Sequence, residues 1–240
     1  MTLKNLYIFL LVFIIGSILF ITCRKITIYK IDSKNLGPRI LLIGGTHGNE
    51  EAGSIALHRL INLYKKDKFK IKKGSLIIIP SLNKCGLLFN SRYYSRISKD
   101  YDLNRLYGTN FFVNSKVEKI IEKIDIVVDL HEGWSFHKIN KKSIGSTIIT
   151  KNIKKKNIDY ILNRINKNIK TSYKKFKNIN IRNIRNIRNS LIHFLTKKYS
   201  NKKFYMLETT GQNNKQQLYI RVNQVINFIE SIFSIHGVIK

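Results

Sequence analysis

Residues 39–50 read RILLIGGTHGNE, and the prediction of the fold depends on this stretch. Its apolar run ends in a Gly-Gly pair, which is typical of a strand buried in a parallel sheet. Apolar residues then recur at roughly helical spacing over Ala52–Tyr64. Ligand sites of α/β proteins lie at the carboxyl ends of such strands. We therefore expect His47 and Glu50, between the predicted strand and helix, to belong to a functional site.

Strand and helix signals continue to alternate along the chain. The further predicted strands are Ser75–Pro80, Asp125–Leu130, Ser146–Thr150 and Lys203–Leu207, and the further predicted helices are Val113–Ile124 and Gln216–Phe233. This alternation predicts an α/β fold with a mostly parallel sheet.

The composition suits one folded domain. The chain has 240 residues, of which 43% are hydrophobic, and two cysteines, so a disordered tail and a disulfide framework are both excluded. The formal net charge is +30, which favours contact with a polyanion such as nucleic acid, an anionic membrane face or an acidic polymer. Codon bias towards lysine is the alternative source of this charge, although it does not explain the scarcity of acids.

The segment Lys151–Ser200 contributes much of the positive charge. It contains 15 lysines and arginines and a single acid, Asp159, and residues 181–189 form a tandem repeat, IRNIRNIRN. The segment is either a surface stretch expanded by replication slippage or a basic face that contacts an anionic surface. It shows no aromatic stacking pattern and no zinc-knuckle spacing, so we predict no specific nucleic-acid binding.

The N-terminal stretch Leu6–Thr22 reads LYIFLLVFIIGSILFIT and carries no charge. Its length lies at the lower limit for a helix that spans a membrane. We expect residues 1–25 to form an uncleaved single-pass membrane anchor, and the side of the membrane that the following domain occupies stays open. A cleaved signal peptide, which would lead to secretion, is the alternative, but no small-residue cleavage site precedes Cys23.

Histidines and carboxylates follow the predicted strands. His47 and Glu50 are three residues apart and can turn towards one point, where imidazole and carboxylate suit zinc. His131 follows another strand and can supply a third ligand, or it can be a structural histidine at the sheet edge. Asp129 shares its face and could orient the imidazole. Glu208 could act as a general base or cap the last helix.

Three polar motifs lie between these residues, namely NKCG at 83–86, SRY at 91–93 and DLNR at 102–105. Arginine supplies a fixed charge and a planar fork that suit a carboxylate or a carbonyl oxygen, and asparagine adds neutral hydrogen bonding. Four of the scarce acids fall among the motifs of the inferred site: Glu50, Asp102, Asp129 and Glu208.

The order of the motifs resembles the zinc carboxypeptidase superfamily. HGNE at 47–50, DLNR at 102–105, DLH at 129–131 and the late Glu208 follow one another as in carboxypeptidase A-like peptidases and in the succinylglutamate desuccinylase/aspartoacylase branch. The run GGTHGNE is closest to the second of these. The resemblance implies a three-layer catalytic domain over residues 26–240, with a mostly parallel mixed sheet flanked by helices, and zinc as cofactor.

The resemblance also implies a role for each site residue. The zinc ligands would be His47, Glu50 and His131, with Asp129 behind His131, and the general base would be Glu208. The substrate's terminal carboxylate would be bound by Asn104 and Arg105, and the scissile carbonyl would be polarised by Arg92, with Arg96 as the alternative. A tyrosine that covers the substrate in many carboxypeptidases has two candidates here, Tyr199 and Tyr205.

The implied activity is hydrolysis of an amide bond next to a free carboxylate, in a peptide or an acyl-amino acid. An N-acyl amino acid deacylase is the alternative, although the β-domain that usually closes aspartoacylase-like sites does not follow the last predicted helix. A second alternative is a non-enzymatic, basic, membrane-tethered binding protein. The complete set of ligands, base and arginines disfavours it.

Overall fold

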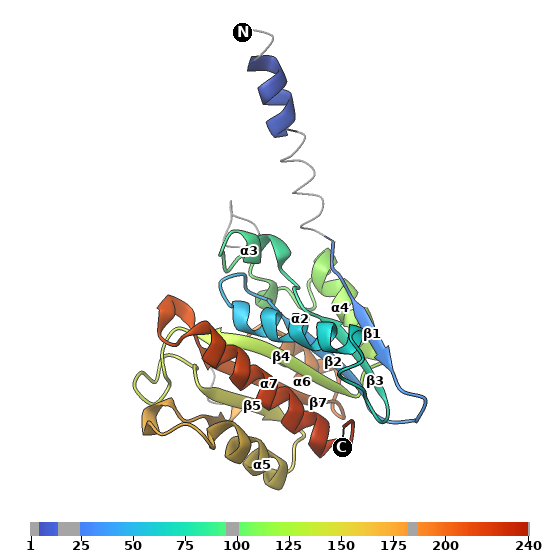
Figure 1. Cartoon of the computed structure of the whole chain (residues 1–240), viewed down its shortest axis with the longest axis vertical. Helices are drawn as coiled ribbons and strands as arrows, with labels where there is room; N and C mark the ends of the chain where they lie inside the picture. The colour runs from blue at the N-terminus through green and yellow to red at the C-terminus, as the bar shows by residue number, and fades with distance from the viewer. Residues whose placement is uncertain (1–4, 14–24, 95–100, 182–186, 240) are drawn as a thin grey trace.

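The computed structural model describes residues 5–13, 25–94, 101–181 and 187–239. A seven-stranded sheet with the order β1-β3-β2-β4-β7-β5-β6 forms its centre (Figure 1). The strands are β1 (Tyr29–Asp32), β2 (Arg39–Gly44), β3 (Ser75–Ile79), β4 (Ile126–Gly133), β5 (Thr147–Lys151), β6 (Lys177–Ile179) and β7 (Lys203–Thr210). The central strands β3, β2, β4 and β7 are parallel, whereas β1 and β5 run antiparallel to β3 and β7. The predicted mostly parallel mixed sheet is thus confirmed.

Helices cover both faces of the sheet. The longer ones are α2 (Glu51–Lys65), α4 (Phe112–Glu122), α5 (Lys155–Asn166), α6 (Leu191–Lys198) and α7 (Leu218–Ile235), and the short ones are α3 (Lys84–Leu88) and the 3₁₀ turns η1 (Leu103–Arg105), η2 (Ser172–Lys174) and η4 (Gln212–Asn214). One apolar core contains buried residues of α2, α5 and α7, and a second contains those of α4 and α6. Alternate residues of the strands enter the two cores, as Leu42 and Leu41 do, so the fold has three layers.

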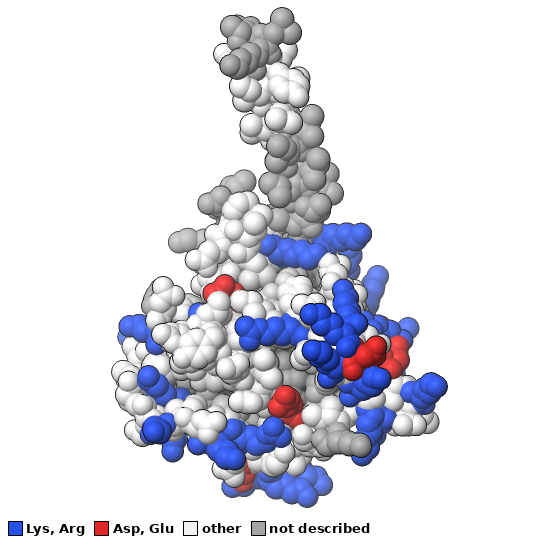
Figure 2. Space-filling view, viewed as in Figure 1, with Lys and Arg blue, Asp and Glu red and all other residues white. Residues whose placement is uncertain are grey.

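The basic segment Lys151–Ser200 is more than a surface stretch, because it supplies α5, β6 and α6. Ile161 and Phe176 are buried in the first core, and Leu191 is buried in the second. Dense lysines and asparagines obscured this apolar pattern in the sequence. Residues 182–186 of the tandem repeat lie outside the described residues. Lysine and arginine side chains are abundant on the face in Figure 2, where few acids are visible.

The N-terminal segment is described only in part. Residues 5–13 are helical, and residues 14–24 lie outside the described part of the chain. Within the described ranges, no helix is long and apolar enough to cross a membrane. The anchor over residues 1–25 and the alternative signal peptide stay predictions.

The strand register brings the predicted site residues to one edge of the sheet. His131 on β4 pairs with Glu208 on β7, so both side chains project from the same face. Gly44 at the end of β2 pairs with Leu130, one residue before His131. The loop that leaves β2 therefore starts beside the carboxyl end of β4.

Tyr205 lies away from that edge. It is fully buried in the core that contains α7, and its hydroxyl is 2.8 Å from Nε2 of His236. This hydrogen bond holds the end of α7 against β7. Tyr205 is therefore no candidate for a tyrosine that covers a substrate.

His236 should make the stability of the protein depend on pH. Burial, together with Lys203 and Lys73, lowers its pKa to about 4, whereas a histidine in an unfolded chain titrates near 6.5. Between these values the unfolded chain binds a proton that the folded chain excludes. The contribution is therefore fully present above about pH 6.5, and it decreases as the pH falls towards about 4.

Urea denaturation at about pH 7 and about pH 5 tests this expectation. The free energy of unfolding should decrease between the two conditions by more in the wild type than in His236→Gln, which cannot titrate. Equal decreases in both proteins would show that His236 is not a source of the pH dependence.

Candidate active site

The loop between β2 and α2 carries His47 and Glu50, and its glycines permit its path. Gly45 has a φ of +61°, in the left-handed region that favours glycine. A Cβ on Gly48 would lie 1.8 Å from the carbonyl carbon of Gly86 in α3, so the two backbones touch where only glycine fits. The loop is thereby held in place, and His47 and Glu50 are buried, with 3% and 2% of their surfaces exposed.

Two imidazoles and one carboxylate converge in the interior. Nδ1 of His47 lies 2.7 Å from Oε1 of Glu50, and Nδ1 of His131 lies 2.8 Å from Oε2 of the same carboxylate. The two Nδ1 atoms are 3.3 Å apart. The possible ligand atoms of these three buried residues all lie within 4.8 Å of one another. They form a group that could bind a metal ion.

The opposite ring nitrogens are engaged by carboxylates. Nε2 of His131 donates to Oδ2 of Asp129 at 2.9 Å, and Nε2 of His47 donates to Oδ1 of Asp102 at 3.1 Å. Each imidazole therefore presents Nδ1 to the centre. Carboxylates behind the imidazoles are typical of metal-binding histidines, and two imidazoles with one carboxylate are a known zinc donor set. The residues present thus fit zinc, and Asp129 is in contact with His131.

Arg92 connects Asp102 to the same group. Its Nε and Nη2 atoms donate to Oδ2 of Asp102 at 3.1 and 3.0 Å, and Nη1 donates to Oε1 of Glu50 at 3.3 Å. Burial opposes the ionisation of Asp102, but the contacts with His47 and the charges of Arg92 and Arg105 hold its pKa well below its usual range. The sequence placed Asp102 in the site without showing this double contact.

Asn104 and Arg105 follow Asp102 in the turn η1. The backbone N–H of Asn104 donates to Oδ1 of Asp102 at 2.9 Å. The side-chain Oδ1 of Asn104 accepts from the backbone N–H of Leu191 at 3.0 Å. The amide NH₂ is then the group that could donate to a ligand. Burial and the neighbouring Arg92 lower the pKa of Arg105, although Asp102 opposes the shift. Two arginine charges so near each other suit an anion.

Glu208 lies beside His131 on the neighbouring strand and is 5% exposed. Burial raises its pKa well above the usual range, and Glu50 and Asp129 raise it further, against the effects of His131 and Arg92. A cation bound by the nearby ligand group would lower this pKa again. A carboxyl group so placed, beside the ligand group, lies where a general base would act.

Three residues that the sequence did not single out support Glu50 from another side. Gln212 Nε2 donates to Oε1 of Glu50 at 3.1 Å and to the carbonyl of Glu132 at 2.6 Å. The backbone N–H of Glu132 donates to Oε2 of Glu50 at 3.0 Å. The carboxylate of Glu132 pairs with the buried Arg221. The only sequence signal for Glu132 and Gln212 is their position at or just after a strand end. Arg96, the alternative to Arg92, lies outside the described residues.

Fold and site together can be compared with those of known proteins. The buried histidine–glutamate–histidine group at the edge of the mixed sheet has the same residue types as the His₂Glu zinc site of carboxypeptidase A. Residues 36–143 match the family described as "Succinylglutamate desuccinylase/Aspartoacylase catalytic domain". The predicted resemblance to the zinc carboxypeptidase superfamily is confirmed. No sequence among the curated proteins compared matches the chain.

Solved structures show the same fold. Apo Csd4, a cell shape determinant protein of Helicobacter pylori, aligns with a TM-score of 0.73 and 19% identity over 90% of this chain and 55% of that one. Its mDAP-bound form, described as a D,L-carboxypeptidase, gives 0.70 and 20% over 88% and 55%. An aspartoacylase family protein of Mesorhizobium loti gives 0.57 and 18% over 90% and 62%. The chain thus spans little more than half of Csd4.

Asp129 should tune the affinity for zinc through His131. Asp129→Asn weakens the acceptor for Nε2 of His131, so we expect zinc affinity to fall by roughly 10–100-fold. Competition of the purified protein with a zinc chelator measures this affinity. The matched control is Asp125→Asn, four residues earlier, where the carboxylate pairs with Arg39 on the surface. Equal zinc affinities for Asp129→Asn and the wild type would contradict the expectation.

Proposed function

We propose that the chain is a zinc-dependent hydrolase of the metallocarboxypeptidase kind, which cleaves an amide bond next to a free carboxylate. The observation that carries the proposal is the convergence of a buried ligand group, a buried carboxyl and a pair of arginines at one sheet edge. The fold shared with Csd4 supports it, because structures of that D,L-carboxypeptidase have been solved with mDAP and with a tripeptide.

The arginines and Asn104 orient the substrate. Arg105, beside Arg92, pairs with the terminal carboxylate, and the Asn104 amide donates a further hydrogen bond. Fixing the carboxylate sets the distance from the chain end to the scissile bond. The reaction is thereby directed to the last amide of the substrate.

The buried groups then supply the chemistry. His47, Glu50 and His131 would hold zinc, which would supply Lewis-acid chemistry for the activation of a water. Glu208 accepts a proton from the attacking water and passes it to the leaving amine. Arg92 donates to the oxyanion of the attacked carbonyl, and one such donor contributes about 3–4 kcal/mol to the barrier reduction.

An N-acyl amino acid deacylase is the second candidate. The match of residues 36–143 to the succinylglutamate desuccinylase/aspartoacylase family favours it. Such a substrate also ends in a carboxylate next to an amide, so the same residues would serve. The two candidates differ in the size of the acyl part.

Glu208→Gln should abolish hydrolysis without removing zinc. The amide is nearly isosteric with the carboxyl but cannot accept the proton, so kcat should fall at least about 10²-fold. The assay combines the zinc content of the protein with the release of free amines from peptide and N-acyl amino acid pools. A zinc-loaded wild type that hydrolyses neither pool would contradict the proposal, and so would a Glu208→Gln variant as active as the wild type.

Arg105→Gln should weaken recognition of the terminal carboxylate. The loss of one charge-assisted contact lowers kcat/KM for substrates with a free carboxylate by roughly 10–100-fold. For the same substrates with an amidated C-terminus, the variant and the wild type should differ little, because the partner of Arg105 is already gone. Arg39→Gln, which alters a surface ion pair, is the control. An equal loss on free and amidated substrates would exclude this role of Arg105.

A further inference from the structure

Two segments near the carboxyl end of β4 form a lysine–aromatic surface. The first is the loop of residues 134–142, which follows β4, and the second is residues 172–177, which contain η2 and the first residue of β6. Phe136 packs edge to face against Tyr173, with 5.4 Å between the ring centroids, and Nζ of Lys138 donates to a backbone carbonyl of the second segment at 2.9 Å. The two segments therefore lie side by side, at the left of the view in Figure 1.

The surface carries six lysines and no acid. They are Lys138, Lys141, Lys142, Lys174, Lys175 and Lys177. Burial lowers the pKa of Lys177, and the charges of Lys141 and Lys138 lower it further, so these three ammonium groups repel one another. Among the described residues, the lysines with an ion pair lie elsewhere, at Lys30, Lys70, Lys155 and Lys198. The charge of the surface is therefore available to an anionic partner.

Three large apolar or aromatic side chains project from the same two segments. Trp134, Ile139 and Tyr173 are 41%, 61% and 39% exposed. Indole and phenol rings gather at the interfaces of lipid bilayers, where apolar side chains reach the acyl chains and lysines are attracted to anionic headgroups. Isoleucine offers no stacking ring and no polar group to nucleic acid, so the combination favours a bilayer as the partner.

The N-terminal helix of the chain suits the same partner. From Leu6 to Phe13, eight consecutive apolar side chains are each at least 41% exposed. A helix that is apolar on all sides is unfavourable in water and is found in a protein core or a bilayer. The chain thus has two separate features that suit lipid.

The loop after β4 is held in one conformation. The backbone N–H of Ser135 donates to Oγ of Ser143 at 2.9 Å, and the same Oγ donates to the carbonyl of Ser135 at 2.6 Å. The backbone N–H of His137 donates to the carbonyl of Gly145 at 2.9 Å. A surface fixed in this way loses little conformational entropy when a partner binds.

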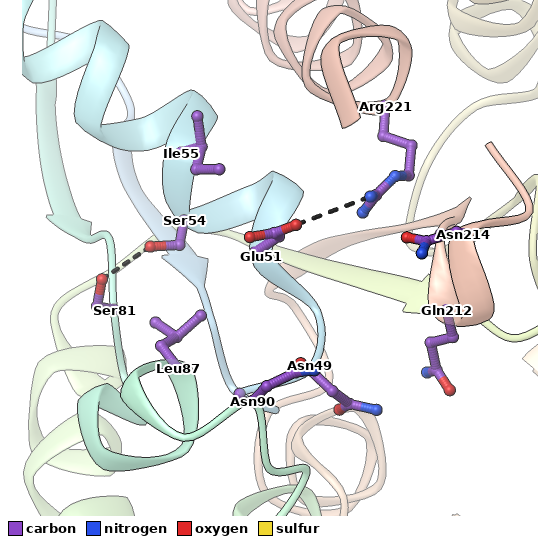
Figure 3. Close-up of a pocket in the computed structure, with 12 residues that line it drawn as sticks. Asn49, Glu51, Ser54, Ile55, Ser81, Leu87, Asn90, Gln212, Asn214 and Arg221 are labelled. Atoms are coloured by element: carbon purple, nitrogen blue, oxygen red, sulfur yellow. Dashed lines mark hydrogen bonds and ion pairs between the residues drawn. The ribbon is translucent and has the colours of Figure 1, made fainter. Parts of the chain in front are cut away.

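The surface is separate from the cavity beside the ligand group. That cavity has a volume of about 640 Å³, and Figure 3 shows the residues that line it. No lysine is among them, and none of them belongs to residues 134–142 or 172–177. The six lysines therefore contribute no charge to the lining of this cavity.

We propose that the lysine–aromatic surface docks the domain on an anionic lipid bilayer. Trp134, Ile139 and Tyr173 enter the interface, and the six lysines face the lipid phosphates. Because Trp134 directly follows Gly133, the last residue of β4, the bilayer then lies next to the edge of the sheet that carries the ligand group. The proposal concerns contact with lipid alone, so it does not depend on the proposed hydrolysis.

The test uses the fluorescence of Trp134, which is the only tryptophan of the chain. The full chain is reconstituted in vesicles of phosphatidylcholine, either alone or with added phosphatidylglycerol, so the N-terminal segment meets a bilayer in both. In the vesicles with phosphatidylglycerol, but not in the others, we expect the emission to move to shorter wavelength and brominated acyl chains to quench it. High salt should reverse both effects, because it screens the lysines.

Two variants with the same change in charge test the lysines. The first is the triple variant Lys138→Gln/Lys141→Gln/Lys142→Gln. The control removes three exposed lysines at the end of α2 and just beyond it, as Lys65→Gln/Lys66→Gln/Lys68→Gln. Each lysine near an anionic membrane contributes about fivefold to binding, so the docking constant obtained from the quenching should fall roughly 100-fold in the first variant. In the control it should stay close to the wild-type value.

Ile139→Ser tests the apolar part of the contact. The variant should lose much of the quenching by brominated chains and keep its salt dependence. The thermal transition of each variant checks that it folds, and if the first triple variant does not fold, the comparison of Ile139→Ser with the wild type decides.

Three results would overturn the proposal. One is the same Trp134 emission in both kinds of vesicle, and another is an equal loss of docking in the two triple variants. The third is a response of Trp134 to single-stranded or duplex DNA, measured in detergent, without any response to anionic lipid. That result would assign the surface to nucleic acid.

Discussion

The site depends on the burial of one carboxylate, that of Glu50. An ionised carboxylate removed from water is strongly unfavourable unless charges and hydrogen bonds compensate for the lost hydration. Here Oε1 faces His47 and Arg92, and Oε2 faces His131 and the backbone N–H of Glu132. Burial raises the pKa of Glu50, but the two imidazoles hold it well below its usual range. A bound divalent cation would compensate the same charge more completely.

The sheet makes this arrangement possible because β2, β4 and β7 lie side by side and run in parallel. Their carboxyl ends deliver three kinds of group to one edge: the β2–α2 loop with two ligands, His131 with its supporting Asp129, and Glu208. Gly48 then fixes the loop by its backbone contact with Gly86. The groups proposed to be catalytic are thus held by strands and a constrained loop, which gives them the fixed positions that catalysis would require.

Much of this was predictable from the sequence, because long apolar runs reveal central strands and the motifs stand at their ends. The short edge strands Tyr29–Asp32 and Lys177–Ile179 gave no such signal, and α5 and α6 were obscured by lysine and asparagine. The contact of Asp102 with His47 joins residues 55 positions apart and depends on the path of two loops. Gln212 and Arg221 are linked to the ligand group by their contacts with Glu50 and Glu132, which join residues far apart in the chain, so no pattern in the sequence indicates them.

The central claim is that His47, Glu50 and His131 form one zinc site. Elemental analysis of protein saturated with zinc and then dialysed, for the wild type and for His131→Ala, tests this claim most directly, with His137→Ala as control because His137 instead contacts the Ser143 carbonyl. We predict one zinc per chain in the wild type and in the control, and almost none in His131→Ala. One zinc per chain in all three proteins, or none in the wild type, would contradict the account.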